Sequence, residues 1–282
     1  MMKPGINLEF ARTENMSFEA GLEQARKAGY EYVECFVFTD VTVKINSHLS
    51  VETSSPYHHI DTAKSNVSKT RQRLEHLGLK FSALDAHTSL LIPQIGVPFL
   101  NKAIDWSAEV GCPIVMSDEG PLPTDWMTLD DAFDIMCISL DTIIKHANSK
   151  GIKIAIELHN KLTTRPDMLL KLLKRFSSSE LGVNFDTGNS FLAGNNPVEM
   201  LQNVVDRVIH VHAKDIPVTQ LHERGHVTGT RVGVGVGDGM VDMPGIISVL
   251  KSANYDGVIS VECDTLPQAS KSYTYLTRQI SL

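Results

Sequence analysis

Residues 153–190 read KIAIELHNKLTTRPDMLLKLLKRFSSSELGVNFDTGNS and contain one complete structural repeat of the chain. The run Lys153–Glu157 predicts a buried strand, Asp167–Phe176 predicts an amphipathic helix, and Leu181–Asp186 predicts a second strand. A helix that joins two strands in this way brings the chain back to its starting edge, so the two strands run parallel. The stretch therefore predicts a strand–helix–strand unit of an α/β protein.

The same alternation continues on both sides of this stretch over the 282 residues. Strands are predicted at Gly5–Phe10, Tyr32–Phe38, Lys80–His87, Pro113–Ser117, Lys153–Glu157, Leu181–Asp186, Val208–His212 and Gly257–Glu262. Helices are predicted at Ser17–Gly29, His59–Gly78, Pro98–Gly111, Phe133–Gly151, Asp167–Phe176, Pro197–Val205, Met243–Ala253 and Gln268–Ile280. Eight such units fit a closed (β/α)8 TIM barrel, with residues 1–282 as a single domain.

A doubly wound open sheet is the alternative architecture for alternating strands and helices. Such a sheet usually carries a glycine-rich turn after its first strand, whereas residues 11–17 read ARTENMS. The long connections at 39–58, 86–97 and 213–241 all follow predicted strands. In a barrel they lie on the face where active sites are built, so we favour the barrel.

Composition excludes several classes of protein. Hydrophobic residues make up 42% of the chain and charged residues 21%, which is typical of a globular protein and not of a disordered chain. A net charge of −7 without a basic run argues against a nucleic-acid partner, and no apolar run is long enough for a membrane helix. The four cysteines are widely spaced, so we expect buried thiols and a cytoplasmic protein without a secretory signal.

Four polar residues end four successive predicted strands, namely Glu157, Asp186, His212 and Glu262. In a barrel they converge at the carboxyl-terminal mouth, where uncompensated charges at the ends of buried strands are costly. A divalent cation would remove the repulsion among three carboxylates, and this donor set suits Mn²⁺, Mg²⁺ or Co²⁺, with Zn²⁺ as a further candidate. The alternative is that each residue merely begins a loop, which explains one such residue better than four in consecutive units.

Five segments resemble the sugar isomerase/epimerase superfamily of xylose-isomerase-like TIM barrels. They are IELHN (156–160), NFDTGN (184–189), HVHAKD (210–215), GVGDGMVDMPGIISVLKSANYDG (235–257) and ISVEC (259–263). The resemblance covers the whole chain in architecture and is most specific from 153 to 264. Close relatives within this superfamily are the ketose 3-epimerases, hydroxypyruvate isomerase and inosose-processing enzymes.

The resemblance implies one divalent metal ion held by Glu157, Asp186, His212 and Glu262, with Glu157 and Glu262 as the catalytic acid/base pair. It implies an epimerase or isomerase of a small sugar or cyclitol that removes a proton beside a metal-bound carbonyl and passes through an enediolate. The same site would serve a dehydratase or lyase of a 3-keto-sugar or inosose. A non-catalytic sugar-binding subunit is the third hypothesis, which the complete ligand set disfavours. Dimers and tetramers are common among such barrels, so a homo-oligomer remains open.

Two positions depart from the ketose 3-epimerase pattern. Those relatives often have a histidine three residues after the metal aspartate, where this chain has Asn189, and an arginine six residues after the metal histidine, where it has Val218. The residues that contact substrate are therefore expected to differ from those of the epimerases. Candidates for contact with substrate are His87, His159, Asn189, Lys214 and Glu34.

Overall fold

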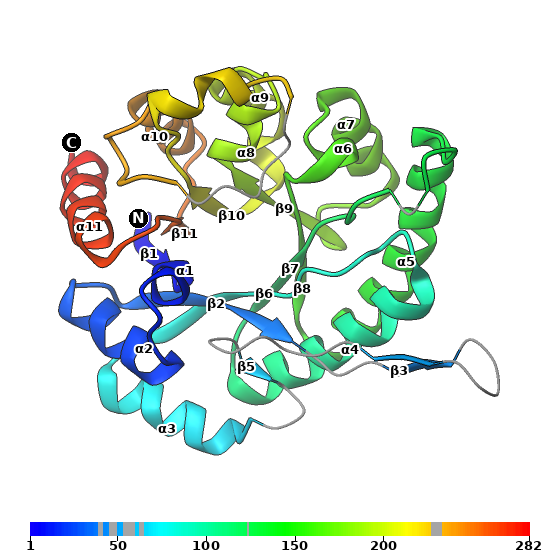
Figure 1. Cartoon of the computed structure of the whole chain (residues 1–282), viewed down its shortest axis with the longest axis horizontal. Coiled ribbons are helices and arrows are strands. Elements are labelled where there is room, and N and C mark those ends of the chain that lie inside the picture. Colours follow the sequence, from blue (N-terminus) through cyan, green and yellow to red (C-terminus); the bar gives the residue numbers. More distant parts are fainter. Residues whose placement is uncertain (39–41, 45–49, 53–59, 62–64, 123, 227–232) are drawn as a thin grey trace.

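In a computed structural model of the chain, eight parallel strands close into a barrel and helices cover its outside (Figure 1). The structure describes residues 1–38, 42–44, 50–52, 60–61, 65–122, 124–226 and 233–282. The barrel strands are β1 (Lys3–Asn7), β2 (Tyr32–Phe38), β6 (Lys80–Asp85), β7 (Ile114–Ser117), β8 (Lys153–Glu157), β9 (Leu181–Asp186), β10 (Val208–Ala213) and β11 (Val258–Val261). Each pairs with the next, and β1 pairs with both β2 and β11, which confirms the predicted (β/α)8 barrel.

The helices lie between these strands and around the barrel. They are α1 (Glu9–Thr13), α2 (Phe18–Lys27), α3 (Val67–Leu77), α4 (Pro93–Val110), α5 (Leu129–Lys150), α6 (Asn160–Thr163), α7 (Pro166–Arg175), α8 (Thr187–Leu192), α9 (Pro197–Val204), η1 (Val205–Arg207), η2 (Val218–Glu223), α10 (Met243–Ser252) and α11 (Leu266–Ser281). Three short strands, β3 (Thr42–Lys44), β4 (Ser50–Glu52) and β5 (Ile60–Asp61), lie in the connection after β2. Strands β3 and β4 form an antiparallel pair, whereas β5 extends the barrel sheet beside β2.

Local sequence signals explain most helix ends. The Ser17 side chain accepts the backbone N–H of Ala20 at the start of α2, and Asp242 accepts that of Gly245 at the start of α10. Gly78 and Gly151 follow α3 and α5 in the left-handed conformation, at φ of 65° and 70°, which glycine adopts without strain.

The prediction of a strand over Gly5–Phe10 is wrong at its end. Strand β1 stops at Asn7, whose side-chain oxygen accepts the backbone N–H of Glu9 at 3.0 Å and begins α1. The polar stretch after the first strand therefore contains a short helix and is not a simple turn.

Three predicted helix starts are also wrong, and one of them is that of α5, which begins at Leu129 after the Thr128 cap and not at Phe133. Helix α3 begins at Val67 because the Asn66 side chain caps it, whereas the predicted start at His59 lies outside the described residues. Helix α4 begins at Pro93, five residues before the predicted start at Pro98, which lies inside the helix. A proline at the first helical position is favourable because its missing N–H is not needed there, and Pro93 takes that position.

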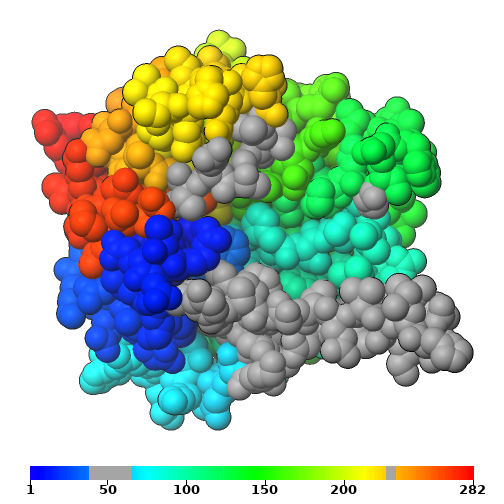
Figure 2. All heavy atoms as spheres, viewed as in Figure 1, coloured from blue at the N-terminus to red at the C-terminus, as the bar shows by residue number. Residues whose placement is uncertain are grey.

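The cysteine prediction agrees with the structure, since all four thiols are buried and unpaired. Among the described helices, none is long and apolar enough to cross a membrane. In Figure 2 the amino-terminal segment, in blue, lies beside the carboxyl-terminal segment, in orange and red, as the pairing of β1 with β11 requires. The site described below lies at the carboxyl ends of the strands.

Candidate active site

Three carboxylates from the ends of β8, β9 and β11 surround one imidazole nitrogen of His212, which lies on β10. The Nδ1 atom of His212 lies 3.6 Å from a carboxylate oxygen of Glu157, 3.8 Å from one of Asp186 and 3.4 Å from one of Glu262. The register explains this convergence, because Asp186 pairs with His212 across β9 and β10 and Glu262 follows directly after β11. We call these four residues the metal cluster.

The metal cluster has the features of a cation site. Glu157, Asp186 and His212 each offer a ligand atom, and these atoms lie within 4.8 Å of one another in buried surroundings. Both Asp186 Oδ2 and His212 Nδ1 are buried without a hydrogen-bond partner. Such atoms are costly to bury unless something binds them. Three carboxylates and one imidazole therefore fit a divalent cation.

Glu34, at the base of the site, fixes the orientation of the His212 ring. It is fully buried, and its Oε1 lies 2.8 Å from His212 Nε2 and also accepts a hydrogen bond from the Asn7 side chain. A carboxylate only accepts hydrogen bonds, so an ionised Glu34 keeps the proton of His212 on Nε2 and leaves Nδ1 free. The structure thus places Glu34 behind the metal cluster.

Asn189 and Lys214 lie between the two glutamates of the metal cluster. The Asn189 amide donates to Glu157 Oε1 at 3.4 Å and accepts from Lys214 Nζ at 3.2 Å. Lys214 Nζ in turn lies 2.8 Å from Glu262 Oε1. Val218 begins η2 and is 67% exposed, so its side chain lies on the surface.

A second group, which we call the imidazole cluster, consists of Asp85, His87, Asp118 and His159. His87 Nε2 lies 2.6 Å from Asp85 Oδ1 and 3.3 Å from Glu157 Oε2, so this group adjoins the metal cluster. Asp118 lies between the two histidines, 3.4 Å from His87 Nδ1 and 2.9 Å from His159 Nδ1. Both histidine side chains are partly exposed, at 26% and 14%, so they face the mouth.

Burial and neighbouring charges shift the pKa values of the imidazole cluster in opposite directions. Burial raises the pKa of Asp85 to about 7. Burial alone would raise the pKa of Asp118, but the two histidines lower it below its usual range. Burial alone would lower the pKa of His87, but Asp85 and Asp118 raise it well above its usual value. The aspartates therefore favour a charged His87 beside Glu157.

Buried His210 contrasts with His212 two residues later. Burial lowers the pKa of His210 to about 4, which keeps its ring neutral. Its Nδ1 lies 3.0 Å from Asn184 Oδ1, and the Asn184 amide donates to Glu157 at 3.1 Å. His210 Nε2 also lies 3.4 Å from Glu34 Oε2, and its ring packs edge-to-face on the His212 ring with 5.6 Å between the centroids, so His210 contacts the surroundings of the metal cluster through Asn184, Glu34 and His212.

The structure brings all nine sequence-predicted site residues into one connected group at the mouth. Sequence reasoning did not identify Asp85, Asp118 and Asn184. Asp85 ends β6 and Asp118 follows β7, so the strand-end rule that singled out the metal cluster would have found both.

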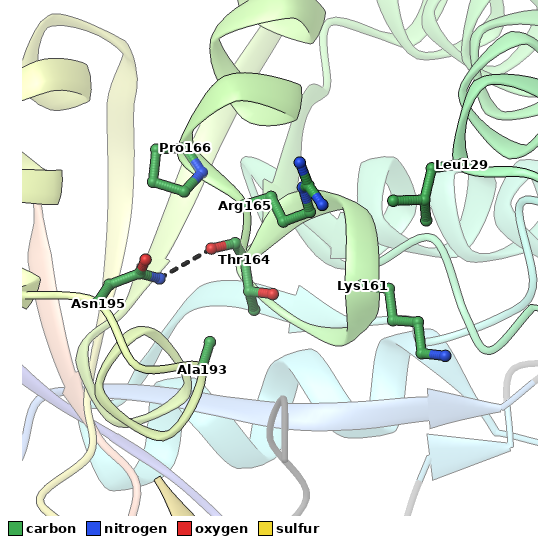
Figure 3. Close-up of a pocket in the computed structure, with 7 residues that line it drawn as sticks. All are labelled: Leu129, Lys161, Thr164, Arg165, Pro166, Ala193 and Asn195. Carbon is green, nitrogen blue, oxygen red and sulfur yellow. Dashed lines mark hydrogen bonds between the residues drawn. The ribbon is translucent and has the colours of Figure 1, made fainter. Parts of the chain in front are cut away.

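Two cavities lie near this group. One, of about 290 Å³, is lined in part by Glu119, Leu122 and Asn160, and the Asn160 side chain donates to Asp118 of the imidazole cluster. The other, of about 240 Å³, lies between α6, α7 and the α8–α9 loop, where the Asn195 amide donates to the Thr164 carbonyl at 2.8 Å (Figure 3). The first cavity therefore adjoins the imidazole cluster through Asn160 and Asp118.

Comparison with known proteins gives one family and several relatives. A family model described as a xylose isomerase-like TIM barrel matches residues 22–278. An uncharacterized protein of Methanocaldococcus jannaschii is 29% identical over 198 residues, which are 68% of this chain and 64% of that protein. An inosose dehydratase of Clostridium beijerinckii is 29% identical over 154 residues, 52% of each chain. The matches thus span about half to two thirds of these curated relatives.

Among solved structures, a D-tagatose 3-epimerase-like protein superimposes with a TM-score of 0.78 and 21% identity, covering 99% of this chain and 97% of the other. At this level of identity the likeness supports the fold.

Proposed function

The chain belongs to the family of xylose isomerase-like TIM barrels, and from this premise we propose that it is a divalent-metal-dependent epimerase or isomerase of a small carbohydrate. The observation that carries the proposal is the metal cluster, where three carboxylates lie 3.4 to 3.8 Å from a histidine nitrogen that has no hydrogen-bond partner. Glu157, Asp186, His212 and Glu262 would hold the cation, for which Mn²⁺, Mg²⁺ and Co²⁺ are the candidates. The match to the family model confirms the family that the sequence analysis recognised. The roles of individual residues are proposals.

A bound divalent cation would supply the positive charge that makes a C–H bond beside a substrate carbonyl acidic. Glu157 and Glu262 are the proposed bases, and they reach His212 Nδ1 from separate strands, β8 and β11. Asn184 orients Glu157, and Lys214 orients Glu262. If one carboxylate removes the proton and the other returns it on the opposite face, the carbon centre is inverted.

The side chains of the imidazole cluster are proposed to contact the substrate beside Glu157. His87 and His159 are partly exposed, and Asp118 fixes both rings by charged contacts. Carboxylates face both ring nitrogens of His87 and Nδ1 of His159, so His159 Nε2 is the proposed partner for a hydroxyl group of a sugar or cyclitol. The adjoining cavity at Glu119 and Asn160 would accept the part of the substrate farther from the cation.

Dehydration of a keto-sugar or inosose is the second candidate. It starts with the same proton removal but ends with loss of a neighbouring hydroxyl group as water. Two observations favour it, namely the similarity to inosose dehydratases and the presence of Asn189 where epimerases often have histidine. A non-catalytic sugar-binding role would not need two glutamates beside one cation.

One experiment tests the proposal and separates the two reactions. Protein loaded with Mn²⁺ is incubated in D₂O with a panel of ketoses, keto-sugars and inososes, and the products are followed by NMR and mass spectrometry. Deuterium incorporation without loss of a substituent supports an epimerase or isomerase, whereas loss of water supports a dehydratase. Absence of both exchange and turnover on the whole panel, in protein that holds about one ion per chain, counts against either reaction.

A further inference from the structure

Lys214 is a buried lysine whose ammonium group contacts the metal cluster directly. The residue is 3% exposed, and its Nζ lies 2.8 Å from Glu262 Oε1 and 3.6 Å from Asp186 Oδ2. Burying an ammonium group is costly unless it is paired. Glu262 and Asp186 supply that pairing inside the site.

The chain holds the Lys214 stem in a closely fitting slot. A Cβ atom at Gly188 would lie 2.6 Å from Lys214 Cγ, and one at Gly233 would lie 3.1 Å from the same atom. Thr187 Oγ1 contacts both the backbone N–H and the carbonyl of Lys214, at 3.1 and 2.8 Å. Two glycines and a threonine therefore fix where the ammonium group lies.

Asn189 extends this contact to the other glutamate of the metal cluster. Its amide oxygen accepts from Lys214 Nζ, and its amide nitrogen donates to Glu157 Oε1 and to the Leu158 carbonyl at 2.9 Å. The neutral amide of Asn189 and the positive ammonium group of Lys214 thus connect Glu157 to Glu262. These contacts set the separation of the two carboxylates even without a cation.

The charges of the site also indicate that Lys214 stabilises the arrangement of the carboxylates without a cation. The three carboxylates of the metal cluster carry three negative charges, which one divalent cation and one ammonium group would balance. Without a cation, the ammonium group of Lys214 reduces the repulsion among the three carboxylates. Once a cation is bound, the two positive centres share Glu262 and repel each other.

We propose that Lys214 is a resident cation of the metal cluster, which keeps Asp186 and Glu262 in place in the metal-free protein and weakens the binding of the divalent cation. The inference rests on the proposed function only in requiring that a divalent cation binds at this cluster. Lys214 is in this respect a positioning residue, and its role is measurable without any substrate.

The test compares Mn²⁺ binding and thermal stability in wild-type protein and in Lys214→Met. The dissociation constant is measured by electron paramagnetic resonance of free Mn²⁺, and the melting temperature is measured in chelator and in excess Mn²⁺. Because Lys214→Met removes a positive charge a few ångströms from the cation, we expect at least about tenfold tighter Mn²⁺ binding. By linkage, the melting temperature falls more in the metal-free form than in the loaded form.

Two further variants sharpen this test. Lys171→Met removes an exposed lysine that pairs with Asp130 outside the site, and it should leave Mn²⁺ affinity unchanged. Gly188→Ala keeps the charge but crowds the Lys214 stem, so it should tighten Mn²⁺ binding in the same direction by a smaller factor. It also serves as the decisive variant if Lys214→Met does not fold in either form.

The outcomes separate this inference from the proposed function. Tighter Mn²⁺ binding, or a Lys214→Met protein that is stable only with Mn²⁺, supports the resident cation. Unchanged or weaker binding with equal losses of melting temperature in both forms overturns it, and Lys214 is then a packing or substrate residue. Wild-type protein that binds no Mn²⁺ overturns both proposals, whereas normal wild-type binding without a shift in the variants overturns this one alone.

Discussion

The metal cluster and the imidazole cluster share Glu157 as a neighbour but satisfy their charges in different ways. In the metal cluster, Asp186 Oδ2 and His212 Nδ1 are buried without a hydrogen-bond partner. In the imidazole cluster, Asp85 Oδ1 and His159 Nδ1 are also buried without a hydrogen-bond partner, but each lies close to one oppositely charged group, at 2.6 Å from His87 Nε2 and 2.9 Å from Asp118 Oδ2. The acidic and basic groups of the imidazole cluster are thus paired at short range, whereas His212 Nδ1 in the metal cluster lies 3.4 to 3.8 Å from three carboxylate oxygens.

This difference indicates that the two clusters have different roles at the barrel mouth. An incompletely satisfied group of carboxylates gains free energy from a cation, while a compensated group gains little and instead holds its rings in fixed positions. Exposure agrees with this division, because the imidazoles are partly exposed and His212 is only 1% exposed. The cation is thus expected on the buried side and the substrate on the open side.

The largest expected effect is loss of the bound divalent ion, which should follow from changes in the metal cluster but not from a change in the imidazole cluster. Replacing Asp186 and His212 together by alanine removes both unpartnered ligand atoms, so the protein should lose its divalent ion and turnover should fall below detection. Metal content is measured by plasma mass spectrometry after dialysis. The matched change in the other cluster, Asp118→Asn, should leave metal content near that of wild type. Equal metal loss in both variants, or retention in the double variant, would remove the distinction.

The next effect concerns the two glutamates of the metal cluster. Glu157→Gln and Glu262→Gln keep an oxygen ligand but remove a base, so turnover should fall by roughly 10²–10⁴ with metal still bound at high concentration. If the two carboxylates act on opposite faces, one variant loses exchange of the substrate α-proton and the other retains exchange without forming product. Both are measured by NMR in D₂O. Near wild-type rates in both metal-loaded variants would contradict the two-carboxylate mechanism, and exposed Glu180→Gln is the control.

A smaller effect, on metal affinity, is expected from a change at Glu34, which lies behind the metal cluster. Glu34→Gln keeps an acceptor for His212 Nε2 but removes the charge that orients and strengthens the imidazole ligand. Loss of such a partner lowers metal affinity by about 10–100-fold, so we expect weaker Mn²⁺ binding in a competition assay with a chelator. Unchanged metal affinity with a higher KM would instead make Glu34 a substrate contact.

The last effect concerns stability on the imidazole side of the mouth and leaves metal binding and turnover aside. Glu119 is buried beside Asp118, and burial raises its pKa from 4.5 to about 8. Between these values the folded state binds a proton that the unfolded state has released, so stability falls as pH rises from 4.5 to 8. Glu119→Gln removes this dependence, and its stability relative to wild type should therefore increase over that range, by the order of a few kcal/mol. Urea unfolding at both pH values measures the difference, and exposed Glu109→Gln should show none.

The sequence by itself determined the barrel and the metal cluster. Periodicity located the strands, and the strand-end rule placed Glu157, Asp186, His212 and Glu262 at one mouth, because parallel strands in a closed barrel end on the same face. Helix starts were less well predicted, since side-chain caps such as Asn66 decide them and several polar residues in each connection can act as a cap.

Only the tertiary structure decided what surrounds the metal cluster. Glu34 lies 178 residues from His212 in the chain, so nothing local in the sequence shows that its carboxylate meets that ring. The same holds for Lys214, whose position depends on Gly188 and Gly233 coming close to its stem from two other segments. The ends of the strands can be predicted from the local sequence pattern. Which side chains meet across the barrel depends on how the sheet closes. The ligand candidates were therefore readable in the chain. Glu34 and Lys214 were also singled out from the sequence, but as substrate contacts, and their contacts with the ligand candidates follow only from the tertiary structure.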